Sequence, residues 1–270
     1  MTMTKVGALS MEYYDEGSGQ PPLLIMGLGG QASSWGEPLL EQLQAHFRTI
    51  RFSNRGTGAT DKPAGGYTVR QMADDAAGLM DAIGLEHGHV FGISMGGMIA
   101  QELILNHPER VQGLVLGCTT CGPAHSVPVP AQTLAQFGQI MQLPPEERIE
   151  RFWEITVTPE FKEQRADFLK RILELGTATP TPMETFGLQF AAIQAMDTYD
   201  RLPQIKSPTL VIHGDRDILV PVENAEILHQ RIPESRVRIV QGTGHCFFWE
   251  NPDEVVEEVV EFLSKLPVGA

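Results

Sequence analysis

One serine in this chain stands in a pattern typical of a nucleophile. Gly92-Ile93-Ser94-Met95-Gly96 is a G-x-S-x-G sequence, which places a serine on a sharp turn between a strand and a helix. The two glycines are needed because a side chain at either position would collide with the neighbouring strand or helix. Such a pentapeptide also arises by chance, so the alternative is a serine in an ordinary loop between a strand and a helix.

The residues around the pentapeptide favour the nucleophile. The segment 89–91 before it has the short apolar character of a buried strand, and the segment 97–105 after it has the pattern of a helix. This helix is expected to end at Asn106-His107-Pro108. Strand, glycine-flanked serine and helix follow each other in the order that the motif requires.

A serine hydroxyl needs a base that takes its proton and a third group that holds the base. Of the eight histidines, His245 is the best candidate, because Gly242-Thr243-Gly244-His245 lies between a predicted strand and the last predicted helix. Two glycines would let this loop turn sharply and present the ring at the ends of the strands. The alternative is a histidine in a surface loop.

Two aspartates follow the predicted strand 209–213, and either could orient the base. We favour Asp217 over Asp215. Asp215 directly follows the strand and Gly214, where a carboxylate usually serves a turn, and it could pair with Arg216.

Backbone N–H groups must also stabilise the oxyanion that develops when a carbonyl is attacked. One donor is expected from Met95, the residue after the nucleophile, at the start of its helix. The second is expected from the loop Gly27-Leu28-Gly29-Gly30, and Leu28 is our candidate from its place in that loop.

The elements that would position these residues alternate along the chain. The segment 6–26 predicts two or three strands, and further strands are expected at 49–52, 89–91, 111–116, 209–213 and 237–240. Helices are expected at 38–47, after Thr68, at 224–231 and from Pro252. Thr68 and Gln71 have the spacing of a capping box, and Asn251 is the expected cap of the last helix. Alternating strands and helices predict a mostly parallel α/β sheet that helices cover on both faces, with the chemistry at the carboxyl ends of the strands.

The middle of the chain has a different character. Residues 122–201 contain many prolines and several helical patterns but no convincing strand, which predicts a helical insertion. We therefore expect a core in two parts, 1–121 and 202–270, with a helical cap at 122–201 between them. Trp153, Phe186 and Phe190 are candidates for a substrate pocket, although aromatic residues at helical spacing more often belong to a core.

Composition excludes several other classes of protein. The chain has 270 residues and a formal net charge of −14, which argues against binding to nucleic acid or to an anionic membrane. No apolar run approaches the roughly 20 residues of a membrane span, and the first residues show no signal peptide.

Three cysteines indicate a reducing compartment, most simply the cytoplasm. Nothing suggests a zinc site or another metal centre, no cofactor is expected, and the oligomeric state stays open, with a homodimer as one option.

Four segments together resemble the α/β-hydrolase superfamily. They are Gly-Ile-Ser-Met-Gly-Gly, Ile-His-Gly-Asp-Arg-Asp-Ile-Leu-Val-Pro, Gly-Thr-Gly-His and Asn-Pro-Asp-Glu-Val. The chain is most similar to compact bacterial members, namely carboxylesterases, enol-lactonases, C–C bond hydrolases and cofactor-free haloperoxidases. The resemblance implies an α/β-hydrolase fold with a helical cap after the sixth strand, a Ser94–Asp217–His245 triad, and Leu28 and Met95 as oxyanion donors. The chain departs from the family pattern at two places. Met26 stands where the family often has His, and Ser53-Asn54 stands where it often has Asp-x.

The resemblance implies a serine hydrolase that cleaves a small carboxylic ester or lactone. The same triad would serve a hydrolase of C–C bonds in ring-cleavage products or a cofactor-free haloperoxidase or perhydrolase. A different class of function is a receptor-like protein that binds a small lactone with little turnover.

Overall fold

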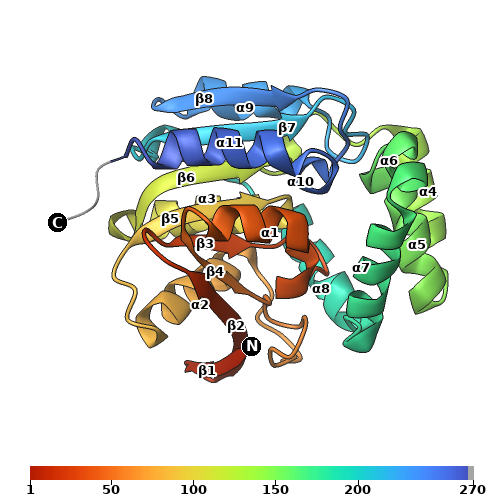
Figure 1. The fold of residues 1–270 in the computed structure, drawn as a ribbon, viewed down its shortest axis with the longest axis horizontal. Coiled ribbons are helices and arrows are strands. Elements are labelled where there is room, and N and C mark those ends of the chain that lie inside the picture. Colours follow the sequence, from red (N-terminus) through yellow and green to blue (C-terminus); the bar gives the residue numbers. More distant parts are fainter. Residues whose placement is uncertain (267–270) are drawn as a thin grey trace.

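The computed structural model describes residues 1–266, apart from the side chain of Pro145, and its centre is one sheet of eight strands (Figure 1). The strand order is β1-β2-β4-β3-β5-β6-β7-β8. β1 pairs with β2 and β2 with β4 in antiparallel fashion, and all other neighbours are parallel, which confirms the predicted mostly parallel sheet. The strands are β1 (Thr2–Val6), β2 (Leu9–Gly17), β3 (Pro22–Ile25), β4 (Arg48–Phe52), β5 (Gly88–Ile93), β6 (Val111–Gly117), β7 (Thr209–Gly214) and β8 (Ser235–Val240).

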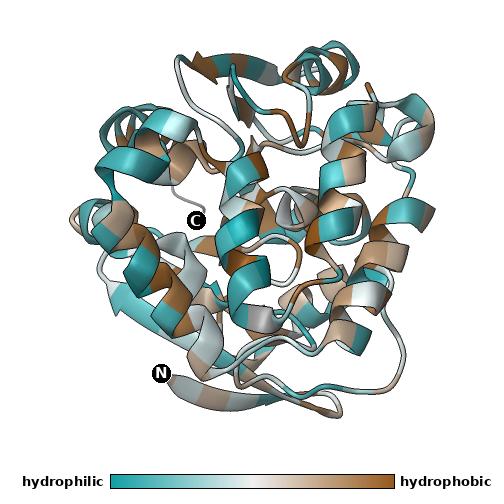
Figure 2. Ribbon diagram, turned by 90° about the vertical axis from the view of Figure 1, so that its right-hand side faces the viewer, coloured by the Kyte–Doolittle hydropathy of each residue, from teal (hydrophilic) through white to brown (hydrophobic). Residues whose placement is uncertain are grey.

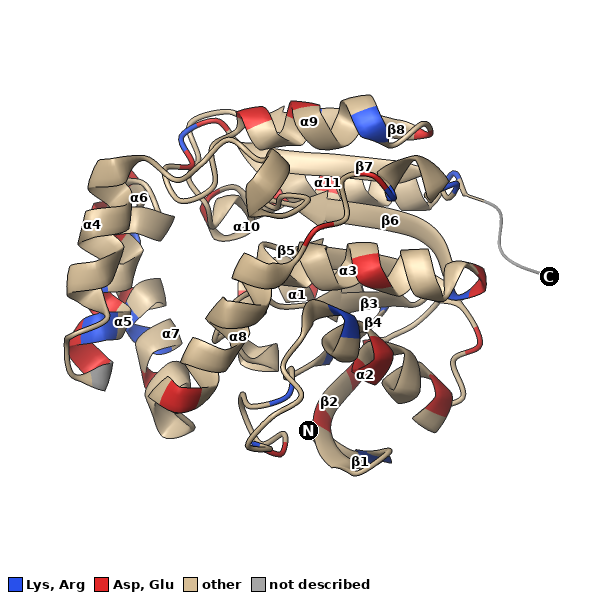
Figure 3. Ribbon diagram, turned by 180° about the vertical axis from the view of Figure 1, so that it is seen from behind, with Lys and Arg blue, Asp and Glu red and all other residues tan. Residues whose placement is uncertain are grey.

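Helices cover both faces of this sheet (Figures 1 and 3). Leu23 and Ile25 of β3 pack into one buried cluster, together with α2 (Val69–Ala82), α3 (Met95–Asn106) and α9 (Glu223–Arg231). Leu24 packs into the cluster on the opposite face, which contains residues of α1 (Glu37–Gln44), α10 (Phe247–Glu250) and α11 (Pro252–Leu263). Burial on both faces is the reason that the central strands are continuous apolar runs rather than alternating ones.

Two helix starts were predicted from side-chain caps, and both caps form. The Thr68 hydroxyl accepts a hydrogen bond from the N–H of Gln71 at 2.9 Å, and the Asn251 side chain accepts one from the N–H of Glu254 at 3.3 Å. The predicted capping box at Thr68 is incomplete, because the Gln71 side chain bonds to Asp75 at 3.5 Å instead of returning to the backbone of Thr68.

Between β6 and β7 the described residues form helices and loops but no strand. We call α4 (Ala131–Ile140), α5 (Pro145–Thr156), α6 (Pro159–Gln164), α7 (Ala166–Ala178) and α8 (Met183–Ala195) the cap helices. α4 to α7 gather at one end of the sheet, and α8 lies nearer to the sheet (Figure 1). The view onto this end shows helices that carry both hydrophilic and hydrophobic residues (Figure 2).

Apolar residues at helical spacing indicate only three helices in this segment, at 149–153, 168–173 and 183–193, which are the positions of α5, α7 and α8, whereas the structure has five α-helices. α4 was missed because Thr133 and Ile140 are its only buried residues, which leaves a weak apolar period. α6 was missed because it has only six residues. The division of the chain into 1–121, 122–201 and 202–270 stays a prediction. Within residues 1–266, no helix combines the length and the apolar character that a membrane crossing requires.

Candidate active site

Ser94 lies on a strained turn between β5 and α3. Its backbone has φ 54° and ψ −123°, and only one other non-glycine residue among those described, Cys118, has a positive φ. Such a conformation is costly and persists only where the surroundings impose it, which is common at functional sites. Ser94 is half-buried, whereas every other residue of the segment 88–104 is buried. The turn therefore presents this hydroxyl outward from an otherwise closed core.

The glycines around Ser94 are fixed by close packing. A Cβ atom at Gly92 would overlap the carbonyl oxygen of Gly96, and one at Gly96 would overlap the carbonyl oxygen of Ile25. A Cβ atom at Gly27, in the loop after β3, would lie 3.1 Å from the Cβ of Ser94. Any larger residue would push the strand, the helix or the loop apart, so the spacing of the motif follows from sterics.

His245 and Asp217 form a buried pair. The Asp217 carboxylate is fully buried, and its Oδ2 lies 2.7 Å from Nδ1 of His245. The other oxygen, Oδ1, accepts hydrogen bonds from the N–H groups of Leu219 and Val220 at 2.9 and 2.8 Å. Nε2 of His213 lies 3.2 Å from Oδ2 and 2.9 Å from the carbonyl oxygen of Val220. These contacts hold the carboxylate in one orientation toward His245.

The pair shifts the pKa of each partner. Burial by itself raises the pKa of Asp217, but His245 and His213 outweigh this effect by charge and hydrogen bonding, and the pKa lies well below the usual 3.8. Burial lowers the pKa of His245, but the Asp217 carboxylate outweighs it and holds that pKa well above 6.5. The aspartate is therefore ionised at neutral pH, and it stabilises the imidazolium that His245 would become as a base.

The structure separates the two aspartates that follow β7. Asp215 is exposed, and its Oδ1 accepts hydrogen bonds from the N–H groups of Gly242 and Thr243 at 2.6 and 3.2 Å. As expected, its carboxylate bonds to backbone N–H groups, and it thereby holds the loop that carries His245. The suggested pairing with Arg216 is wrong, because Arg216 bonds to Glu160 at 3.1 Å.

Leu28, in the loop after β3, and Met95, at the start of α3, are the expected oxyanion donors, and both line the same cavity as Ser94. The N–H of Met95 is at the first position of α3, where a helix offers no partner of its own. The N–H of Leu28 makes no hydrogen bond within residues 1–266. Both donors are therefore available to a ligand.

Side chains that the sequence did not single out hold the Leu28 loop. Asn54, which follows the departure from the family pattern at Ser53, donates a hydrogen bond to the carbonyl oxygen of Met26 at 2.9 Å and so supports the loop. Gln189 of α8 is fully buried; it accepts a hydrogen bond from the N–H of Gly29 at 2.9 Å and donates one to the carbonyl oxygen of Arg55 at 3.0 Å. Thr181 donates a hydrogen bond to the carbonyl oxygen of Gly29 at 2.9 Å. The loop is thus held from the core and from a cap helix together.

The His245 loop is also tied to the cap helices. Glu250 accepts hydrogen bonds from the N–H groups of Gly244 at 2.8 Å and of Thr158 at 3.1 Å. The carbonyl oxygen of Thr156 accepts one from the N–H of Cys246 at 2.7 Å. The sequence signal for this role of Glu250 is weak, because its partner Thr158 is 92 positions away in the chain.

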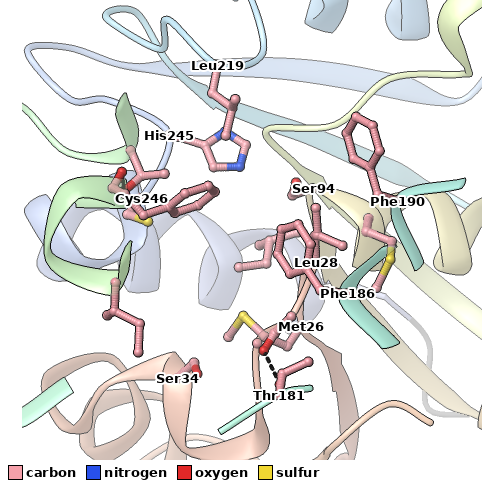
Figure 4. Close-up of a pocket in the computed structure, with 18 of the residues that line it drawn as sticks. Met26, Leu28, Ser34, Ser94, Thr181, Phe186, Phe190, Leu219, His245 and Cys246 are labelled. Carbon is pink, nitrogen blue, oxygen red and sulfur yellow. Dashed lines mark hydrogen bonds between the residues drawn. The ribbon is translucent and has the colours of Figure 1, made fainter. Parts of the chain in front are cut away.

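A cavity of about 330 Å³ joins Ser94 to the cap helices. Figure 4 shows Ser94 and His245 at the same cavity, with a ring nitrogen of His245 on the side toward Ser94. The pocket candidates Trp153, Phe186 and Phe190 all line it. Most other lining residues are apolar, among them Met26, Leu28, Met98, Phe137, Met141, Ile149, Phe152 and Phe248. This size is at the small end of the range for pockets that bind small organic molecules.

Within residues 1–266, no group of three or more His, Cys, Asp or Glu side chains is arranged to hold a metal ion.

Known proteins resemble this chain over nearly its whole length. A family model described as "alpha/beta hydrolase fold" matches residues 21–252. A protein of Azorhizobium caulinodans with the provisional name carbamate hydrolase RutD is 30% identical, over 96% of this chain and 97% of its own length.

Two solved structures show the same architecture. The enol-lactonase of Burkholderia xenovorans LB400 has a TM-score of 0.86 at 25% identity and covers 98% of this chain and 100% of its own. A thermophilic esterase of Thermogutta terrifontis has a TM-score of 0.83 at 26% identity and covers 98% of each chain. The sheet order, the segment of helices between β6 and β7 and these matches lead to one conclusion. The chain belongs to the α/β-hydrolase family and has its fold.

Proposed function

We propose that this hydrolase cleaves a carboxylic ester or a lactone through an acyl-enzyme on Ser94. The observation that supports this most strongly is the joint placement of three features at one apolar cavity. They are a serine on a strained turn, a histidine bonded to a buried carboxylate, and two free backbone N–H groups. Nucleophile, base, orienting acid and oxyanion donors are the parts that acyl transfer requires.

Each residue has one role in the proposed reaction. His245 takes the proton from Ser94 as the hydroxyl attacks the carbonyl carbon, and the N–H groups of Leu28 and Met95 stabilise the oxyanion. His245 then gives the proton to the leaving alcohol, which departs from the acyl-enzyme. The same histidine activates a water molecule that releases the acid, while Asp217 holds the ring in one tautomer. This mechanism needs no metal ion or organic cofactor.

The test is a panel of 4-nitrophenyl esters and of lactones of graded size, each measured with the wild type and with Ser94→Ala. We expect turnover of at least one substrate class that depends on Ser94. Hydrolysis of neither class, or only a single turnover, would contradict the proposal.

The raised pKa of His245 predicts the pH dependence of the reaction. Only the neutral ring can accept the proton from Ser94, so kcat/KM should fall as the pH drops through the pKa of His245. The inflection should lie above 6.5 because the Asp217 carboxylate stabilises the charged ring. A pH series on a neutral ester measures it. An inflection below 6.5, or a rate that does not change with pH, would show that His245, paired with Asp217, is not the general base.

Gln189→Ala should lower kcat about tenfold or more, with a smaller change in KM. The substitution leaves the buried N–H of Gly29 without its partner, at a cost of about 1–3 kcal/mol, and loosens the loop that carries the Leu28 donor. Gln139→Ala, at an exposed position of α4, is the matched control. Steady-state kinetics on one ester distinguishes them, and equal kcat values for both variants would remove Gln189 from this role.

A further inference from the structure

The cavity contains one side chain with a permanent positive charge. Arg148 of α5 lines it, and the other lining residues include no Lys, Arg, Asp or Glu. Figure 3 shows basic residues on α5 at the cap end of the molecule. Apart from His245, the cavity therefore combines a mostly apolar lining with a single cation.

No acidic side chain among the described residues is paired with Arg148. Within the described residues, the guanidinium of Arg148 forms no ion pair, and burial alone accounts for its lowered pKa. Arg151, one turn further along α5, is paired with Glu154 at 2.8 Å. The guanidinium stays charged at neutral pH, and partial burial of a charge without a counter-ion is unfavourable. A bound anion would supply the missing partner.

The helix places this cation far from the reacting centre. The residues of α5 that line the cavity recur at helical spacing and form one face, which runs from Arg148 through Ile149, Phe152 and Trp153 to Thr156. Thr156 contacts the catalytic loop, since its carbonyl oxygen accepts the N–H of Cys246. Thr156 follows Arg148 by eight positions, which correspond to about 12 Å along the helix axis. Side chains lean toward the start of a helix, which for Arg148 is the end of α5 away from Thr156.

We propose that Arg148 binds a carboxylate at the end of the substrate distant from the scissile carbonyl, an inference that rests on the proposed ester or lactone hydrolysis. The preferred substrates are then half-esters of dicarboxylic acids, or esters and lactones with an equivalent distal carboxylate. The apolar face between Arg148 and Thr156 accommodates the methylene chain. A guanidinium suits this task because its planar fork can donate two parallel hydrogen bonds to one carboxylate.

The experiment compares mono-4-nitrophenyl esters of adipic and suberic acid with the corresponding terminal amides, which match them in shape but carry no charge. The measured quantity is the ratio of kcat/KM for the acid to that for the amide. We expect a ratio above one for the wild type with at least one chain length, and a decrease of about tenfold to a hundredfold in Arg148→Gln. Arg148→Lys should retain part of the preference. Arg151→Gln, on the same helix but outside the cavity lining, should keep the wild-type ratio. A wild-type ratio of one or below at both chain lengths, or an equal ratio in Arg148→Gln, would overturn the proposal.

Binding separates this inference from the proposed function. Calorimetry with suberate and with suberamide, the neutral diamide of suberic acid, needs no turnover. It can be done with the wild type and with Arg148→Gln. We expect the wild type to bind suberate more tightly than the diamide, and the substitution to remove the difference. Such binding without any ester turnover would support the carboxylate site while contradicting the hydrolase proposal. Ester turnover without a preference for the dianion would do the reverse. If Arg148→Gln does not fold, the wild-type comparison of suberate with the diamide and the Arg148→Lys variant still decide the question.

Discussion

Ser94→Ala is expected to lower kcat by about 10⁶-fold, since the loss of a serine nucleophile removes almost all of the catalysis that the triad provides. The fold should be preserved, because alanine retains the Cβ atom at the turn and Ser94 makes no side-chain hydrogen bond within the described residues. Hydrolysis of the best ester of the panel, followed with a large amount of purified variant, measures the residual rate.

The matched control for this prediction is Ser264→Ala, at an exposed position just after α11. It should have the wild-type kcat. A Ser94→Ala variant that retains a tenth or more of the wild-type rate would exclude an acyl-enzyme on Ser94.

Asp217→Asn should lower kcat by about 10⁴-fold and leave the fold intact. The amide oxygen can still accept the N–H groups of Leu219 and Val220, so the loop after β7 keeps its conformation. The amide nitrogen, however, replaces the oxygen that His245 and His213 contact, and a donor there opposes the ring N–H. The ring then loses both its correct tautomer and the charge that stabilises its protonated form.

Asp215→Asn is the matched comparison, because it changes the same functional group two residues away. Its amide oxygen can still accept the N–H groups of Gly242 and Thr243, so we expect a decrease in rate of less than tenfold. The stability should change by about 1 kcal/mol or less, as expected when a charged acceptor becomes neutral. Kinetics and thermal unfolding of both variants measure these effects. The reverse order of rates would show that Asp215 orients the base.

The sheet was predictable because its signals are local. The run that includes Leu23 and Leu24 is apolar without interruption, and only a strand buried on both faces needs this. The helix starts at Thr68 and Asn251 were predictable for the same reason, since a cap and its partner lie three residues apart. α4 carried no comparable signal, because few of its residues are buried.

The candidate site divides in a similar way. Ser94 and His245 lie near glycines that close packing (Gly92 and Gly96) or a positive φ (Gly242) requires, so their places could be inferred from neighbouring residues. Gln189 and Glu250 gave no such signal, because each bonds to backbone that is distant in the chain. Arg148 was missed for a related reason: the absence of an ion-pair partner is a property of the folded chain and cannot be recognised in a sequence.

If Ser94 is an activated nucleophile, a fluorophosphonate should label it, and intact-mass analysis with peptide mapping measures this labelling. A hydroxyl reacts with this reagent only when a neighbouring base activates it. We expect one adduct per chain, located on the peptide that contains Ser94 and absent from Ser94→Ala. No adduct on the wild type, or an adduct that persists in Ser94→Ala, would contradict it.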